Sequence, residues 1–276
     1  MYNTINSSEN KKYKRWLKLL KRKYRDSEGV YLIEGYKLIE EAVKNNIEIE
    51  EIILDSEADS SLISKLEELI IYSKTAVYVL DTKLYRKLAQ MENGVGIMAV
   101  VSRQDYTLKT FSECISKNRK GCSGNLVVLD RLQDPGNIGT IIRTADGAGF
   151  GGLVVMKGTG DIYSPKVVRS AVGSIFRLPV LFASDNDELG EILDFLGKRM
   201  IVTCFDTDNY HYDADLSEDA AIVIGNEGRG VSEELIENAD VRVKIPMYGN
   251  IDSLNASVAA GILMYESVRQ SEIDSR

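Results

Sequence analysis

Short uninterrupted apolar runs, separated by amphipathic helical stretches, constrain the fold of this chain more than any other feature. Runs such as "LVVL" and "AIVI" are typical of parallel strands that helices cover on both faces. The spacing predicts six such strands in the second half of the chain: Leu126–Leu129, Leu153–Met156, Val180–Phe182, Met200–Cys204, Ala221–Ile224 and Val241–Ile245. With a closing helix at "NASVAAGILMYESVRQ", residues 125–276 are expected to form an α/β domain with a parallel sheet.

The first half of the chain alternates in the same way on a smaller scale. Strands are predicted at "IEEIILD", "AVYVL" and "VGIMAVV", with helices before and between them. Residues 1–101 are therefore expected to form a small α/β domain with a largely parallel sheet. Residues 102–124 mix Lys, Ser, Gly and Asn with little apolar pattern and are interpreted as a linker.

Residues 11–25, "KKYKRWLKLLKRKYR", carry nine basic residues and no acidic one, although the net charge of the whole chain is −8. Apolar side chains recur here at helical spacing, so a single basic amphipathic helix capped by Ser7 or Ser8 is expected. Dense positive charge favours contact with nucleic-acid phosphates, through Lys18, Arg22 and Arg25. Two alternatives are a solvated helix that covers the neighbouring domain and a helix on a membrane surface.

Several classes of protein are disfavoured by composition. No apolar run approaches the roughly 20 residues that span a bilayer, and no secretory signal is recognisable at the start, so a cytoplasmic protein is expected. Three cysteines without CxxC spacing predict neither a disulfide framework nor a zinc site. The single histidine, His211, has no partner for a metal pair or a catalytic triad, so no metal is expected.

Gly147, Gly149 and Gly152 have the G-x-G-x-x-G spacing of a dinucleotide-binding turn. That turn needs a strand before the glycines and a helix after them, whereas here a helix precedes them and the strand "GLVVM" follows. The glycines are therefore interpreted as the end of a helix, which argues against a nicotinamide or flavin oxidoreductase.

Three polar loops follow predicted strands, at the sheet edge where parallel sheets bind ligands. In "DRLQDPGNIGTIIRT", Asn137 is expected to cap a helix and Arg143 to project toward an anion. In "IGNEGRGVSEEL", the glycines are expected to expose backbone N–H groups as a nest around a ligand, beside Glu227. In the third loop, "VKIPMYGNIDSLNASVAAGILMYE", Ser253 and Asn255 lead into a small-residue helix that suits a core or a subunit interface. These loops predict a site that binds and positions without metal or thiol chemistry.

The segments "NIGTIIRTADGAGF", "IVIGNEGRG" and "IPMYGNIDSLNASVAAGILMYE" resemble, in order, the three motifs of the SpoU (TrmH-like) family of RNA ribose 2′-O-methyltransferases. The stretch "YLIEGYKLIEEAV" is similar to the start of the family's N-terminal substrate-binding domain. The resemblance implies a C-terminal SPOUT-type domain with a deep trefoil knot. It also implies S-adenosylmethionine as the cofactor, a homodimer with a site composed across the interface, and an N-terminal domain resembling an RNA-binding ribosomal protein.

The resemblance also assigns roles to individual residues. It implies that Arg143 is the catalytic arginine, that Asn137 orients that arginine or the ribose, and that Glu227, Ser253 and Asn255 support both. The cofactor would rest on a further set of residues: Thr203, Gly225, Asn226, Gly230, Ile245, Met247 and Leu254. Ribosomal RNA is the expected substrate, with transfer RNA and a catalytically silent RNA-binding relative as alternatives.

Overall fold

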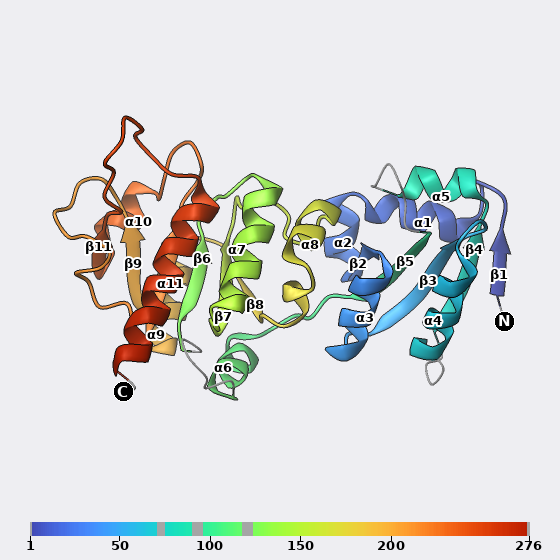
Figure 1. Ribbon diagram of the computed structural model, residues 1–276, viewed down its shortest axis with the longest axis horizontal. Coiled ribbons are helices and arrows are strands. Elements are labelled where there is room, and N and C mark those ends of the chain that lie inside the picture. Colours follow the sequence, from blue (N-terminus) through green and yellow to red (C-terminus); the bar gives the residue numbers. More distant parts are fainter. Residues whose placement is uncertain (1, 71–74, 90–95, 118–123, 275–276) are drawn as a thin grey trace. The chain divides into compact units, whose positions relative to one another are not determined.

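The computed structural model of the chain describes residues 2–70, 75–89, 96–117 and 124–274. The chain divides into two compact units. Unit 1 consists of residues 1–104 together with residues 163–176, and unit 2 consists of residues 105–162 and 177–276. Figure 1 shows each unit as a sheet with helices on both faces. No helix in the described part of the chain is long and apolar enough to cross a membrane.

Unit 1 is built on a five-stranded sheet in the order β1-β4-β3-β5-β2. Its strands are β1 (Tyr2–Ile5), β2 (Val30–Glu34), β3 (Ile49–Asp55), β4 (Ala76–Leu80) and β5 (Ile97–Ser102). The pairs β1–β4 and β3–β4 are parallel, but β5 runs antiparallel to both β3 and β2. The sheet is therefore mixed, not largely parallel as predicted, because an apolar run indicates a strand without indicating its direction.

The helices of unit 1 cover both faces of this sheet. They are α1 (Lys11–Leu19), α2 (Arg22–Glu28), α3 (Tyr36–Lys44), α4 (Ser60–Ile70) and α5 (Thr82–Leu88). Helices α1 and α5 share one core with alternate residues of the strands, including Leu32 and Ile53. Helices α3 and α4 contact each other on the opposite face of the sheet (Figure 1).

The basic stretch forms two helices and not one. Asn10, rather than Ser7 or Ser8, caps α1, because its side-chain oxygen accepts hydrogen bonds from the N–H groups of Lys12 and Tyr13. At Lys21 the backbone turns to an extended conformation (φ −105°, ψ 132°) before α2 begins. The apolar side of the first helix is buried: Tyr13 and Trp16 are at most 1% exposed. A helical charge pattern could not reveal this break, since basic residues continue through it.

The boundaries between the units differ from the expected ones in two places. The expected linker contains α6 (Leu108–Lys117), whose Phe111 is fully buried in the core of unit 2. In the second half of the chain, α8 (Pro165–Ala171) and a short 3₁₀ turn (Ser174–Phe176) belong to unit 1, where α8 packs on β2. The crossover after β7 (Gly152–Met156) therefore contributes to the first unit.

Unit 2 has a six-stranded sheet in the order β11-β9-β10-β6-β7-β8. Besides β7, its strands are β6 (Leu126–Leu129), β8 (Val180–Ala183), β9 (Arg199–Thr203), β10 (Ala220–Ile224) and β11 (Val241–Val243). All five pairings are parallel, which confirms the predicted α/β domain with a parallel sheet. The carboxyl ends of these strands meet at one edge and position the candidate site.

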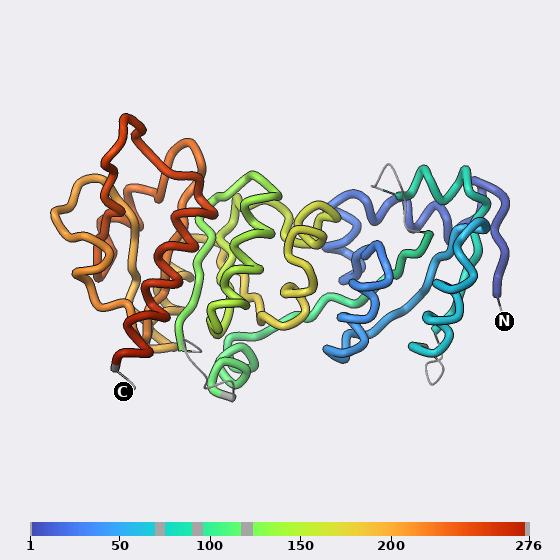
Figure 2. Tube along the Cα trace, viewed as in Figure 1, coloured from blue at the N-terminus to red at the C-terminus, as the bar shows by residue number. Residues whose placement is uncertain are grey.

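Helices cover both faces of the second sheet. Besides α6, they are α7 (Pro135–Gly147), α9 (Asn186–Leu196), α10 (Glu233–Glu237) and α11 (Ala256–Asp274). Helices α7 and α11 lie side by side on one face (Figures 1 and 2), and α6, α9 and α10 contribute to the core on the other.

The predicted ending of the helix before "GLVVM" is confirmed. Helix α7 stops at Gly147, and Gly149 has a φ of 73°, which a side chain would strain. Gly152 starts β7 where an added Cβ would lie 2.7 Å from the ring of Phe111. These glycines therefore serve chain reversal and packing, not a dinucleotide.

Candidate functional site

The first loop begins α7 at the carboxyl end of β6. Asp134 caps this helix, because its Oδ1 accepts a hydrogen bond from the N–H of Asn137 at 2.9 Å. Pro135 occupies the first helical turn, where a missing N–H costs nothing. Asn137 therefore lies inside the first turn and is not the cap that the sequence suggested. Its side chain is free of capping and available for contacts between loops.

Glu227 joins the second loop to the first. Its carboxylate accepts hydrogen bonds from the backbone N–H groups of Gln133 (3.1 Å) and Asp134 (2.9 Å) and from Nδ2 of Asn137 (3.2 Å). Partial burial by itself raises the pKa of Glu227, but these donors outweigh burial and hold the pKa below its ordinary value. Glu227 is therefore an ionised anchor and a weak proton acceptor.

The glycine-rich loop around Glu227 is a closed hairpin and not an open nest. Asn226 and Gly230 exchange two backbone hydrogen bonds, at 3.0 and 2.8 Å. The side-chain oxygen of Asn226 also accepts from the N–H groups of Gly228 and Arg229. Because these N–H groups already have acceptors, the loop offers no free cluster of donors to an anion. The expected nest is therefore wrong, and Asn226 and Gly230 shape the loop instead.

The third loop reaches the first through Asn255. The Oδ1 of Asn255 accepts from the N–H of Ser257 at 2.9 Å at the start of α11, and its Nδ2 donates to Oδ1 of Asn137 at 2.9 Å. A continuous chain of hydrogen bonds thus runs from Asn255 through Asn137 to Glu227. Ser253, by contrast, is exposed, and its side chain contacts no hydrogen-bond partner in the described part of the chain.

Arg143 lies on α7, six residues beyond Asn137, and is exposed. It forms no hydrogen bond or ion pair with any residue that the structure describes, whereas Arg131 and Arg177 are each paired with an aspartate. A guanidinium stays protonated at ordinary pH. Arg143 therefore presents a permanent positive charge on the helix that the first loop begins.

The residues proposed to hold a cofactor lie at the carboxyl ends of three neighbouring strands. Thr203 ends β9, Gly225 follows β10, and Ile245 and Met247 follow β11. Thr203 and Gly225 are half-buried, as are the side chains of Ile245, Met247 and Leu254. A Cβ on Gly225 would lie 2.2 Å from the backbone of Gly230, so only glycine lets the chain pass here. The combination of main chain and half-buried apolar side chains suits a flat apolar ring with polar edges.

The structure adds two site residues that the sequence analysis did not single out. Asp134 caps α7, and Gln133 donates its backbone N–H to Glu227. An Asp directly before a Pro at a helix start is a recognisable cap signal, and it could have identified Asp134. The described residues contain no group of three or more His, Cys, Asp or Glu that could hold a metal.

The residues expected to contact RNA are not equivalent. Arg25 is 5% exposed and donates a hydrogen bond to the backbone oxygen of Leu19, so it serves the packing of unit 1 and cannot reach a phosphate. Arg22 is exposed but pairs with Asp26 at 3.4 Å. Lys18 is exposed, with its ammonium 5.5 Å from the centre of the Tyr24 ring. The helical pattern placed all three on one side because it assumed one continuous helix.

Comparison with known proteins assigns both units. The model of the SpoU rRNA Methylase family matches residues 124–265, which contain all three loops. The chain belongs to this family. A model described as MRM3-like substrate binding domain matches residues 10–99, within unit 1.

Several relatives match nearly the whole chain. The 23S rRNA (guanosine(2553)-2′-O)-methyltransferase RlmP of Bacillus subtilis is 34% identical, over 95% of this chain and 97% of the relative. The 23S rRNA (uridine(2479)-2′-O)-methyltransferase of Streptomyces viridochromogenes is 32% identical, over 96% of this chain and 91% of the relative. The AdoMet-bound rRNA methyltransferase from Sinorhizobium meliloti is similar with a TM-score of 0.84 and 26% identity, and the match covers 97% and 98% of the two chains.

Proposed function

We propose that this protein transfers the methyl group of S-adenosylmethionine to a ribose 2′-hydroxyl of ribosomal RNA. The observation that carries the proposal is the hydrogen-bonded chain Asn255–Asn137–Glu227, which unites three family motifs at the carboxyl edge of a parallel sheet. Arg143 lies on the same helix as Asn137 and has no ion pair among the described residues. The relatives named above act on 23S rRNA, which supports ribosomal over transfer RNA. A ribosomal RNA substrate supports the cytoplasm as the compartment in which this protein acts.

The cofactor would rest on the main chain around Thr203 and Gly225 and on the side chains of Ile245, Met247 and Leu254. These residues fit an adenosine, since half-buried apolar side chains can cover a base while main-chain groups bind its edge. When bound, S-adenosylmethionine supplies a methyl group that its sulfonium has already activated. The task left to the protein is to align the ribose oxygen and to favour loss of its proton.

Arg143 serves this task by charge. As a protonated guanidinium it binds the phosphate next to the target ribose and stabilises the negative charge that develops on the 2′-oxygen. The departing proton passes to solvent, because Arg143 has no free lone pair and the lowered pKa of Glu227 makes its carboxylate a weak base. Asn137, fixed from both sides by Asn255 and Glu227, keeps the first turn of α7 in place beneath Arg143.

The active unit in this proposal is a homodimer in which Arg143 of one protomer acts beside the cofactor of the other. Exposed apolar side chains on α11 support it: Val258 is 49% exposed and Tyr265 54%. In the third loop Tyr248 is 92% exposed. Aromatic and apolar surface of this kind on neighbouring elements is typical of a subunit interface.

A deep trefoil knot is part of the same proposal. After the edge strand β11 the chain returns to the middle of the sheet, where α11 packs on β10 and α7. The loop before β10 lies close to the returning segment, since Lys244 donates its N–H to Asn209 and accepts from the N–H of His211. This close approach of the two segments supports a threaded chain.

Transfer of labelled methyl from S-adenosylmethionine into ribosomal RNA tests the function directly. Wild type should label one ribose, and Arg143→Ala should lower kcat by about 10²–10³-fold, as does loss of a donor to a developing oxyanion. Arg143→Lys should restore only part of the rate, because lysine lacks the planar fork. Arg199→Ala is the matched control, since Arg199 starts β9 at the opposite edge of the sheet. If the wild type transferred no label although it bound the cofactor, the protein would be a catalytically silent RNA-binding relative.

Subunit complementation tests the composite site. Arg143→Ala and Leu254→Asp should each be inactive alone, the second because a charge enters the cofactor site. Mixed and allowed to exchange subunits, they should regain part of the wild-type rate, since one site of each mixed dimer then has both intact halves. No recovery in a confirmed mixed dimer would contradict a shared site.

A further inference from the structure

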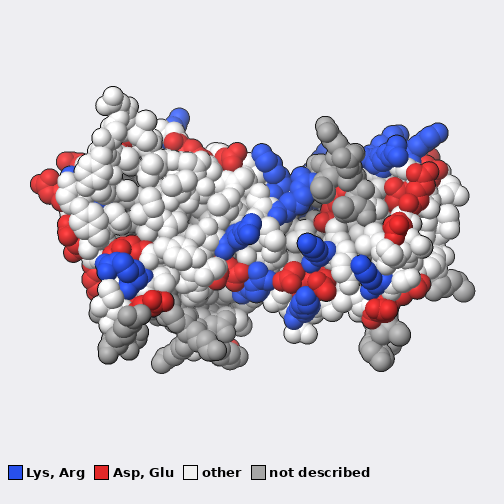
Figure 3. All heavy atoms as spheres, viewed as in Figure 1, with Lys and Arg blue, Asp and Glu red and all other residues white. Residues whose placement is uncertain are grey.

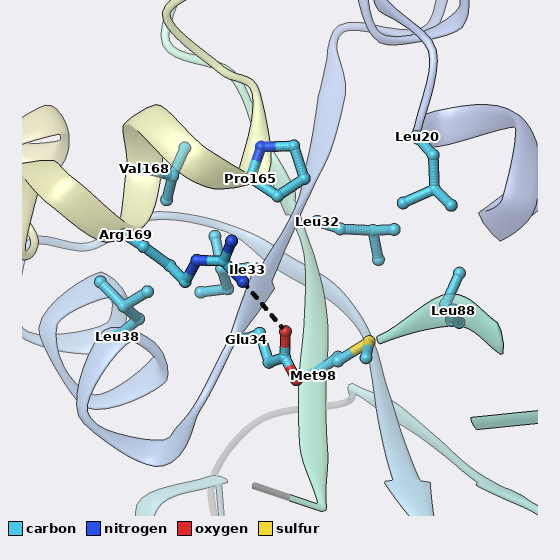
Figure 4. A pocket seen from close by; sticks show the side chains of 10 residues that line it. All are labelled: Leu20, Leu32, Ile33, Glu34, Leu38, Leu88, Met98, Pro165, Val168 and Arg169. Atoms are coloured by element: carbon cyan, nitrogen blue, oxygen red, sulfur yellow. Dashed lines mark ion pairs between the residues drawn. The ribbon is translucent and has the colours of Figure 1, made fainter. Parts of the chain in front are cut away.

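Three helix ends meet around a small cavity in unit 1 (Figure 4). Leu20 follows the end of α1, Leu88 ends α5 and Pro165 begins α8, and all three side chains line the cavity. Beneath them Arg169 of α8 pairs with Glu34 of β2 at 3.8 Å. The cavity is apolar above this pair, so the three helix ends border one shared apolar space.

Five cations lie at or next to these helix ends. They occupy the last turn of α1 and the residue that caps α2, the last turn of α5, and the first turn of α8: Lys18, Lys21, Arg86, Lys87 and Lys166. All five are exposed, and none forms an ion pair with a residue that the structure describes. In Figure 3, Lys and Arg side chains lie next to α5 and, as a separate group, next to α8.

Three other cations of the basic stretch, Lys12, Lys14 and Arg15, are neutralised within the unit. Lys12 and Arg15 both pair with Glu51, which is 4% exposed and also accepts from the indole N–H of Trp16. Lys14 pairs with Glu9. Unit 1 thus supplies acidic partners to cations that hold its helices together. It supplies no acidic partner, among the described residues, to the five cations at the three helix ends.

We propose that Lys18, Lys21, Arg86, Lys87 and Lys166 form a binding surface for the phosphate backbone of RNA. This inference rests on the proposed function and names the surface through which unit 1 holds its substrate. Four of the five residues are lysines, which act as point charges toward phosphate, whereas arginine forks are preferred where base edges are read. The surface therefore supplies affinity and positioning, not sequence recognition.

The test measures binding of the full-length protein to fluorescein-labelled poly(U) by anisotropy over a series of salt concentrations. The double variant R86Q/K87Q should weaken binding about tenfold at moderate salt, because about two counterion-releasing contacts are lost. It should also lower the slope of log K against log [salt] by about 1.4, or roughly 0.7 per phosphate of a single strand. The matched control is K37Q/K65Q, with the same charge change on α3 and α4 of the opposite face.

Lys166→Gln provides a second variant on a separate helix. It should also weaken binding, with half the change in salt slope expected for R86Q/K87Q. Thermal melts identify any variant that fails to fold. The substituted side chains are all exposed, so we expect every variant to fold like the wild type. Unchanged binding in both surface variants would overturn the inference, as would an equal loss in K37Q/K65Q. The binding readout does not depend on methyl transfer, so inactive wild-type enzyme would count against the proposed function alone.

Discussion

Asn255 donates a hydrogen bond from Nδ2 to Oδ1 of Asn137 across 118 residues of sequence, at 2.9 Å. The same Asn137 donates from its Nδ2 to Glu227 at 3.2 Å. The amide of Asn137 thus accepts a hydrogen bond at its oxygen and donates one from its nitrogen, which fixes its orientation. These two hydrogen bonds tie the starts of α7 and α11 to the hairpin between Asn226 and Gly230. Helix α7, which carries Arg143, and the second and third loops are consequently one hydrogen-bonded assembly.

This arrangement predicts strong coupling between Asn137 and Asn255. Asn137→Ala and Asn255→Ala should each lower kcat about 10–100-fold by loosening α7, and the double variant should cost little more than either alone. A double-mutant cycle on kcat measures the coupling. Thr140→Ala, on an exposed position of the same helix, serves as the control. Additive losses would show that the two amides act separately.

The lowered pKa of Glu227 predicts a pH-dependent contribution to stability. Its folded-state pKa is depressed, so the contribution is present above the unfolded pKa of about 4.5 and is lost as the pH falls through the folded value. Glu227→Gln should therefore lower the free energy of unfolding by about 1 kcal/mol at pH 7, a modest value because the carboxylate is partly solvated. Denaturant unfolding at pH 7 and pH 3 checks this. A difference that persists unchanged at pH 3 would contradict it.

The close backbone contact at Gly225 predicts that an added side chain destabilises the fold there but not at Gly228. A Cβ there would lie 2.2 Å from the backbone of Gly230 and Val231, so Gly225→Ala must displace the hairpin and should destabilise unit 2 by about 2–4 kcal/mol. At Gly228 the nearest atom is the Asn226 side-chain oxygen at 3.7 Å, so Gly228→Ala should change stability little. Thermal unfolding of both variants makes the comparison, and equal melting temperatures would refute the steric argument.

The burial of Arg25 predicts that its substitution lowers the stability of the protein without lowering its affinity for RNA. Removing its buried side chain leaves the Leu19 carbonyl without this donor, so Arg25→Ala should cost about 1–3 kcal/mol of stability. Affinity for poly(U), measured well below the melting temperature, should stay near the wild-type value because Arg25 is not exposed. A loss of affinity in the folded variant would return Arg25 to the RNA-binding set.

Patterns of short range allowed much of unit 2 to be predicted. Continuous apolar runs indicated buried parallel strands, and the order of glycines, helix and strand around Gly149 excluded a dinucleotide turn. The three motifs also placed Asn137, Glu227 and Asn255 in loops at the carboxyl edge of one sheet. These signals are local, because a few adjacent residues determine whether a segment suits a helix, a strand or a turn.

Tertiary structure decided the features that depend on distant partners. The direction of β5, the packing of α8 in unit 1 and the burial of Arg25 follow from which segments meet, and a segment's own residues carry little information about that. Glu51 neutralises part of the basic stretch from a strand some forty residues away, so the charge count along the sequence overstated the free positive surface. The sequence alone determined the elements and the chemistry of the loops. Packing decided which charges and amides have partners, because each hydrogen bond or ion pair joins groups that only the folded chain brings together.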